Sequence, residues 1–302
     1  PSFPNPGNIA AKLFCYHGDG KLVWISDQRV DLYTQFRETP GGTPALADFN
    51  QDGIPEIYVN NKIFNARTGI KLADGGPNGI GRGVAVNFAG DALTIAAQLD
   101  EDSTDLELAA GYTVYKVIIT NVNGMASNTM TPYNITTDNV YRDGYTLIAD
   151  VNLDGRLDVL VTCPGLSGEA LLYAYTISKG KALLVAKTYP QGIEYTGIGP
   201  AFIGDIKGSG KSSILITRFT KLLAYSYDGT SRFQLDWSFP TTDSSGFNGL
   251  TMFDFNQDGI QEIVYRDETD VKIINGSTTI PNLIAKIRCL SPTWSEYPIV
   301  GD

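Results

Sequence analysis

Short apolar runs, many of them alternating with polar residues, follow one another along almost the whole chain. Examples are residues 57–59, 159–161 and 263–265, and segments rich in glycine, aspartate and asparagine separate such runs. Apolar runs of this length between frequent turns are typical of β-strands. No window of useful length spaces its apolar residues at the helical period of about 3.6. The pattern therefore predicts an all-β protein.

An acidic motif recurs along the chain at intervals of about fifty residues. Its form is Asp-x-Asn-x-Asp-Gly-x-x-Asp/Glu, with copies that begin at Asp48, Asp150 and Asp254, and a degenerate copy begins at Asp205. The spacings are 102 residues from 48 to 150, 55 from 150 to 205 and 49 from 205 to 254. Because the first spacing is twice the others, a further copy is expected near residue 99. The acidic segment 100–107 lies there, out of register by about one residue.

The repeating unit is larger than the motif. An apolar strand follows each motif, and a hairpin with a glycine turn usually comes next, as in residues 223–237. A unit of about fifty residues that contains about four strands describes one blade of a β-propeller. We therefore predict a single propeller domain over residues 1–302 with about six blades.

The two ends of the chain leave this array incomplete. The predicted hairpin at residues 12–25 has no motif before it, and Asp302 falls where a sixth motif would begin. A missing inner strand would leave backbone N–H and C=O groups unpaired, which is unfavourable. We therefore expect the chain to be part of a larger propeller of seven or eight blades, with further blades or domains in the same polypeptide.

The motif can surround a cation with oxygen atoms. Side chains at positions 1, 3 and 5 can turn to one side, and glycine at position 6 permits a positive φ. The backbone carbonyl at position 7 and the acid at position 9 can complete the shell, and oxygen ligands without sulfur or imidazole favour Ca²⁺. Self-capped Asx turns without metal are the alternative. The predicted ligands of about three Ca²⁺ ions are Asp48, Asn50, Asp52, Ile54, Glu56, Asp150, Asn152, Asp154, Arg156, Asp158, Asp254, Asn256, Asp258, Ile260 and Glu262.

The two other copies lack part of this ligand set. Lys207 stands at the third position of the copy at Asp205, where its ammonium could replace the cation by pairing with Asp205. Ser209 and Ser213 replace carboxylates in the same copy, so no calcium is expected there. The other copy carries Asp100, Asp102, Asp105 and Glu107. These acids either bind an ion in an altered geometry or form a solvated turn.

Charge and composition exclude several classes of partner and chemistry. The chain has 33 acidic and 23 basic residues, a formal charge of −10, which argues against a nucleic-acid partner. No apolar run approaches the roughly 18–20 residues of a membrane helix, so no membrane insertion is expected. The one histidine, His17, falls at a predicted hairpin tip, the three cysteines form no C-x-x-C, and there is no Gly-x-Ser-x-Gly. We therefore predict no catalytic residues and no enzymatic activity.

The repeated loops resemble the calcium-binding loops of FG-GAP/VCBS repeats, which form the blades of integrin α-subunit propellers and of many bacterial surface proteins. The resemblance covers essentially the whole chain at the level of blades, and the loops are its most specific part. It implies a secreted or cell-surface protein that calcium stabilises and that acts in adhesion or ligand recognition. The implied partner is a protein or a glycan, and no ligand-binding residue carries over from the family.

Two other functions compete with adhesion. Some polysaccharide lyases are calcium-dependent propellers with related repeats, so the chain could belong to an enzyme that acts on a polysaccharide. A propeller could also serve as a structural spacer in a larger surface or secretion complex. Degradation of an acidic polysaccharide would favour the lyase, ligand capture without turnover would favour the adhesin, and neither result would favour the spacer.

Overall fold

The computed structural model describes residues 12–30, 44–76, 94–102, 104–133, 144–163, 172–188, 198–244, 246, 248–290 and 298–301. Within these ranges the regular structure is entirely β-strand, and no helix suited to crossing a membrane is found among them. The chain divides into two compact units, one of residues 1–146 and 176–183 and the other of residues 147–175 and 184–302. The predicted single domain over residues 1–302 and the larger ring stay predictions, and Asp302 lies outside the described residues.

The strands form one two-stranded hairpin and five four-stranded sheets in the described part of the chain. The hairpin consists of β1 (Phe14–Tyr16) and β2 (Leu22–Ile25), and the first full sheet of β3 (Ala45–Ala47), β4 (Glu56–Val59), β5 (Lys62–Asn65) and β6 (Lys71–Asp74). The second sheet contains β7 (Thr94–Ala97), β8 (Glu107–Ala110), β9 (Thr113–Ile118) and β10 (Thr129–Pro132).

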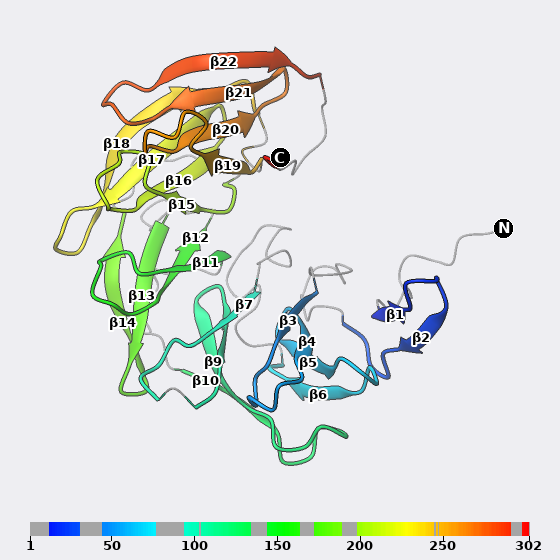
Figure 1. The fold of residues 1–302 in the computed structure, drawn as a ribbon. Coiled ribbons are helices and arrows are strands. Elements are labelled where there is room, and N and C mark those ends of the chain that lie inside the picture. The colour runs from blue at the N-terminus through cyan, green and yellow to red at the C-terminus, as the bar shows by residue number, and fades with distance from the viewer. Residues whose placement is uncertain are drawn as a thin grey trace. The chain divides into compact units, whose positions relative to one another are not determined.

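The third sheet contains β11 (Tyr145–Ala149), β12 (Asp158–Thr162), β13 (Leu172–Ser178) and β14 (Lys181–Lys187). The fourth contains β15 (Phe202–Gly204), β16 (Ser213–Arg218), β17 (Lys221–Tyr227) and β18 (Phe233–Pro240), and the fifth β19 (Leu250–Phe253), β20 (Glu262–Arg266), β21 (Asp270–Asn275) and β22 (Asn282–Arg288). In every four-stranded sheet the chain runs from one edge strand to the other in sequence order, as a blade requires (Figure 1). The predicted four-stranded blades are thus confirmed, and the expected hidden copy near residue 99 is the β7–β10 sheet.

Neighbouring sheets within each unit bury their apolar faces against one another. In the first unit Phe49, Tyr58, Leu72, Leu108 and Tyr115 belong to one buried cluster drawn from the β3–β6 and β7–β10 sheets. In the second unit one cluster joins the β11–β14 and β15–β18 sheets, and another joins the β15–β18 and β19–β22 sheets. The strands of each sheet carry apolar residues on both faces, and these side chains form the buried clusters between neighbouring sheets.

A tryptophan from one sheet docks on the glycine turn of the next sheet at two places. Trp24 donates its indole N–H to Ala66 O at 3.1 Å, and a Cβ on Gly69 would lie 2.5 Å from the Trp24 ring. Trp237 donates to Gly276 O at 3.0 Å, and a Cβ on Gly276 would lie 2.7 Å from its ring. The β1–β2 and β17–β18 hairpins therefore make the same kind of contact.

Candidate metal-binding loops

The repeated motif always occupies the connection from the first to the second strand of a four-stranded sheet. The complete loops join β3 to β4, β11 to β12 and β19 to β20, and the two incomplete loops join β7 to β8 and β15 to β16. The first residue of each complete loop is half-buried, the tip faces solvent, and the ninth residue is buried at the start of the second strand.

The first loop folds around the side chain of Asp48. Its Oδ1 accepts the N–H of Asp52 at 3.1 Å, and its Oδ2 accepts the N–H of Gly53 at 2.8 Å. Asn50 Oδ1 accepts the same Asp52 N–H at 3.1 Å, and Asp52 Oδ1 accepts the N–H of Ile54 at 2.8 Å. The Asn50 side-chain amide also donates to Asp52 Oδ2 at 3.2 Å. Side chains at positions 1, 3 and 5 therefore lie together on the inside of the turn, as the motif predicts.

The other two complete loops repeat every one of these hydrogen bonds, at distances between 2.8 and 3.1 Å. The seventh residues, Arg156 and Ile260, donate their backbone N–H to the fifth-position carboxylates as Ile54 does. In addition, the Arg156 guanidinium lies 3.4 Å from Asp154 Oδ2. Three segments far apart in the chain thus adopt one local structure.

The backbone of these loops is left-handed at two positions. Glycine at position 6 has φ of 83°, 87° and 84° at Gly53, Gly155 and Gly259, as the motif predicts. Position 4 is also left-handed, with φ of 56° at Gln51, 59° at Leu153 and 58° at Gln257. Sequence reasoning missed this second position because glutamine and leucine carry no signal for positive φ.

The ninth-position acids are buried beneath the loops. Glu56 is 3% exposed and Asp158 0%, and they accept the N–H of Phe49 at 3.0 Å and of Val151 at 3.1 Å. Burial, together with the nearby loop aspartates, raises the pKa of Glu56 to about 7 and that of Asp158 to about 6. Glu262 repeats the contact by accepting the N–H of Phe255 at 3.0 Å.

The donor set of the complete loops fits a hard cation. The first, fifth and ninth positions supply carboxylates and the third supplies an amide oxygen, and an oxygen that accepts one N–H retains a second lone pair. Asp158 Oδ1 is buried and has no hydrogen-bond partner. A buried carboxylate oxygen without a partner is costly, and a cation would satisfy it. These observations match the chemistry of Ca²⁺ rather than that of a softer metal.

The loop between β7 and β8 is one residue longer than the complete loops. Glu107 Oε2 accepts the N–H of Leu99 at 2.8 Å, the contact that Glu56 makes with Phe49, so Gln98 stands where the complete loops have their first aspartate. Asp100 and Asp102 then occupy the third and fifth positions, and Asp102 N–H donates to Asp100 Oδ1 at 2.9 Å as in the other loops. The predicted shift of about one residue is thereby confirmed.

This longer loop gathers the acids most closely. Asp100, Asp102 and Glu107 offer oxygens within 4.8 Å of one another, the one such group of three found among the described residues. Lys116 Nζ contacts Asp102, and it lies 3.4 Å from Asp100 Oδ2 and 3.8 Å from Asp105 Oδ1. The hydrogen bond with Asp102 raises the pKa of the Lys116 ammonium and lowers that of the Asp102 carboxyl. Burial raises the pKa of Glu107 to about 7.

The loop between β15 and β16 keeps its turn and differs from the prediction in its ion pair. Asp205 still accepts the N–H groups of Ser209 at 3.0 Å and of Gly210 at 2.5 Å. Lys207, which was expected to pair with Asp205, instead places Nζ 2.8 Å from Asp236 Oδ2 on β18. The expectation was wrong because the lysine stem is long enough to reach the outer strand of its own sheet.

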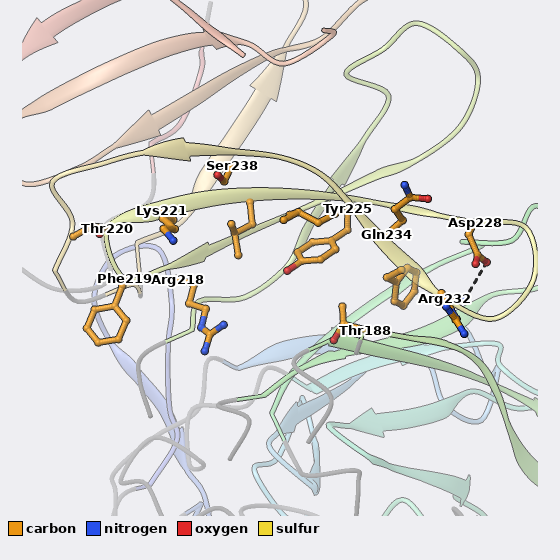
Figure 2. A pocket seen from close by; sticks show the side chains of 13 residues that line it. Thr188, Arg218, Phe219, Thr220, Lys221, Tyr225, Asp228, Arg232, Gln234 and Ser238 are labelled. Carbon is orange, nitrogen blue, oxygen red and sulfur yellow. Dashed lines mark hydrogen bonds between the residues drawn. The ribbon is translucent and has the colours of Figure 1, made fainter. Parts of the chain in front are cut away.

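A separate depression of about 1030 Å³ lies on the β15–β18 sheet of the second unit. Figure 2 shows Arg218 at one end, Asp228 and Arg232 at the other, and Tyr225 between them. Asp228 Oδ1 accepts the N–H groups of Thr230 at 2.8 Å, Ser231 at 3.0 Å and Arg232 at 3.1 Å, so the one acid of the lining is held by its own turn. No sequence motif marks this depression, because strands and turns from several positions build it.

Comparison with solved structures finds the same kind of fold. The chain is 13% identical to the V. cholerae biofilm matrix protein Bap1, over 94% of this chain and 66% of that one, with a TM-score of 0.50. Together with the five meanders, this likeness decides the fold class. The fold is a β-propeller.

Two further structures match with lower TM-scores. An Agrocybe aegerita lectin that recognises non-reducing terminal N-acetylglucosamine is 15% identical, over 92% of this chain and 74% of that one, with a TM-score of 0.45. The exotype rhamnogalacturonan lyase YesX is 14% identical, over 89% of this chain and 43% of that one, with a TM-score of 0.35. The propeller therefore spans less than two thirds of the Bap1 and YesX chains. No protein-family model and no curated protein sequence matches the chain.

Proposed function

We propose that the chain is a calcium-stabilised propeller of the FG-GAP/VCBS type that serves as an adhesion or ligand-recognition module of a secreted or cell-surface bacterial protein. Calcium has a structural role in this proposal, because the loops tie the first strand of each blade to the second. The ligand is a glycan or a protein, and the chain binds it without chemical turnover.

One observation carries the calcium part of the proposal. Three loops separated by 102 and 104 residues, from 48 to 150 and from 150 to 254, share one hydrogen-bond network and one pair of left-handed residues. Each network holds three carboxylates within a nine-residue segment, where like charges repel. Repetition of an arrangement that is unfavourable without a cation supports a cation at each copy.

The depression on the β15–β18 sheet supports the recognition part. Its lining contains Arg218, Lys221 and Arg232 against the single acid Asp228, in a chain whose formal charge is −10. Tyr225 lies between the two arginines with most of its ring buried in the core, so only its edge lines the depression. Guanidinium groups that flank an aromatic ring suit a ligand that carries carboxylate or sulfate groups, such as an acidic glycan.

The first test counts calcium on the folded chain and measures binding to a panel of glycans and matrix proteins, in calcium and in chelator. We expect about three bound Ca²⁺ ions, and Asp158→Asn should lower the count by one while Asp19→Asn, on the β1–β2 hairpin, leaves it unchanged. Ligand capture that chelator abolishes, without release of product, supports the proposal.

Other outcomes would favour the alternatives. Release of unsaturated sugars from an acidic polysaccharide would make the chain a lyase, and the recognition role would then be wrong. A calcium-loaded chain that binds nothing on the panel would favour a structural spacer. A chain that binds no calcium would overturn the structural role of the loops.

A further inference from the structure

The residue opposite the ninth loop position, on the third strand of each blade, is neutral in four of the five sheets. Asn65 pairs with Glu56, and Ser226 pairs with Ser213. Val159, which follows Asp158, pairs with Tyr175, so Thr176 stands opposite Asp158. Ile263, which follows Glu262, pairs with Ile274, so Asn275 stands opposite Glu262. In the β7–β10 sheet this position is Lys116, the partner of Glu107. A lysine therefore stands opposite the ninth loop position only in the blade whose loop has an extra residue, and residues 100–107 of that loop include five acids.

The ammonium of Lys116 lies among the groups that would ligate a metal. It contacts Asp102 at the fifth position, lies 3.4 Å from Asp100 at the third, and lies 3.8 Å from Asp105. In the complete loops the third- and fifth-position oxygens are the predicted ligands. A single ammonium among three carboxylates supplies the positive charge that the loop needs.

The other groups of this loop are arranged as around a cation. Tyr133 donates its hydroxyl to Asp100 Oδ2 at 2.6 Å and so fixes that carboxylate. Glu107 is 0% exposed, its Oε2 accepts two backbone N–H groups, and its Oε1 is buried without a hydrogen-bond partner. The neutral Gln98 replaces the first-position aspartate, so the carboxylate around which the complete loops fold is absent here.

We propose that Lys116 is a tethered cation that takes the place of the metal in the β7–β8 loop, and that its removal opens a calcium site there. The inference rests on the proposed calcium sites of the complete loops. In the wild-type chain an ammonium, which a chelator cannot remove, then stabilises the β7–β8 loop, whereas exchangeable ions stabilise the three complete loops.

The test compares the wild type with Lys116→Asn, which installs the residue found at the same position in the β3–β6 sheet. Calcium bound per folded chain is counted by elemental analysis after equilibrium dialysis. We expect three ions for the wild type and four for Lys116→Asn. Lys181→Asn, which removes an exposed lysine from β14, should bind three. Lys116→Gln keeps most of the aliphatic stem and serves as a second variant if the asparagine form does not fold.

Thermal unfolding gives an independent readout. Without calcium, Lys116→Asn should melt below the wild type because the carboxylates of Asp100, Asp102 and Asp105 lose the ammonium beside them, and calcium should restore most of the loss. Four ions on the wild type, or three on both Lys116 variants, would overturn the inference. If the wild type binds no calcium, the proposed function fails, and the variants still decide the role of Lys116, since one bound ion supports it and none overturns it.

Discussion

Acidic residues in the turns of this protein differ widely in how far they are buried and in which groups they contact. Asp158 and Glu56 start the second strands of their blades, where the core removes them from water while a backbone N–H still binds one oxygen. Asp228, in contrast, is exposed, and the hydrogen bond from the Thr230 N–H leads several that lower its pKa to about 2. The same residue type therefore serves as a candidate metal ligand in one turn and as a turn cap in another.

The buried acids should make the calcium-free protein less stable as the pH rises. Their pKa values are raised in the folded state, to about 7 for Glu56 and about 6 for Asp158, from ordinary values of 4.5 and 3.8. The folded state therefore binds more protons than the unfolded state between these values. The stability that this confers is fully present below the ordinary values and is lost as the pH rises through about 6 to 7.

Thermal melts of calcium-free protein across this range check the prediction. The melting temperature should fall with rising pH, and Glu56→Gln should flatten part of the fall, whereas Glu101→Gln at the exposed loop between β7 and β8 should not. In calcium the fall should disappear, because bound metal favours the ionised carboxylates. A melting temperature that rises over the same range without calcium would contradict the prediction.

At the scale of elements, the docking of tryptophan on glycine turns links one blade to the next. The close approach of Trp237 leaves no room for a side chain at Gly276, where a Cβ would also lie 3.0 Å from Ile206 and Ile263. The same holds for Trp24 and Gly69. The same contact is therefore made at two junctions between neighbouring sheets.

Substitutions at this contact should be strongly destabilising. Trp237→Ala should lower the free energy of unfolding by about 3–5 kcal/mol, because it removes a buried ring and its hydrogen bond to Gly276 O. Gly276→Ala should lower it by about 1–3 kcal/mol through overpacking against the ring. Gly18→Ala is the matched control, since a Cβ there meets nothing within 4 Å. Urea denaturation measures all three, and an unchanged midpoint for Gly276→Ala would show that the contact is not tight in solution.

The depression on the β15–β18 sheet should bind acidic glycans through its arginines. Arg218→Gln and Arg232→Gln should each weaken binding by about tenfold or more, since a hydrogen bond to a charged group contributes about 1.5–3 kcal/mol. Lys181→Gln on β14 is the control for loss of a positive charge outside the depression. Calorimetric titration with acidic and with neutral oligosaccharides measures the effect. Equal loss of binding for neutral sugars, or no loss for acidic ones, would contradict the role of charge.

At the scale of the whole molecule, the three complete loops contribute a large part of the negative charge. Nine of the 33 acids lie in the three complete loops, and three Ca²⁺ ions would move the formal charge from −10 to −4. Loss of calcium should therefore leave the chain with strong internal repulsion, concentrated at the start of three second strands.

Salt should reveal this repulsion. Sodium chloride at about 0.15 M screens charges beyond about 8 Å, so it should raise the melting temperature of the calcium-free chain more than that of the calcium-loaded chain. Differential scanning calorimetry at several salt concentrations checks the difference, with potassium chloride as the control for a specific sodium effect. An equal response of the two forms would mean that calcium does not neutralise these charges.

The sequence by itself determined the blade repeat and the hydrogen bonds inside its loops, but not the left-handed fourth position. The hydrogen bonds of the loop that begins at Asp48 join residues at most seven positions apart, so the chemistry of a nine-residue segment suffices to predict them. Glycine at position 6 and alternating oxygen-bearing side chains encode this turn locally, whatever the rest of the chain does. Strand order within a blade followed from the same spacing.

Only the tertiary structure decided which distant groups meet those loops. Lys116 reaches Asp100 across a strand pair 16 residues along the chain, and Lys207 reaches Asp236 rather than Asp205 because β18 lies within its stem length. The depression near Tyr225 and the docking of Trp237 on Gly276 depend likewise on strand register and on how neighbouring sheets pack. A one-residue slip in register turns a side chain to the opposite face of its sheet, so such contacts cannot be deduced from local pattern.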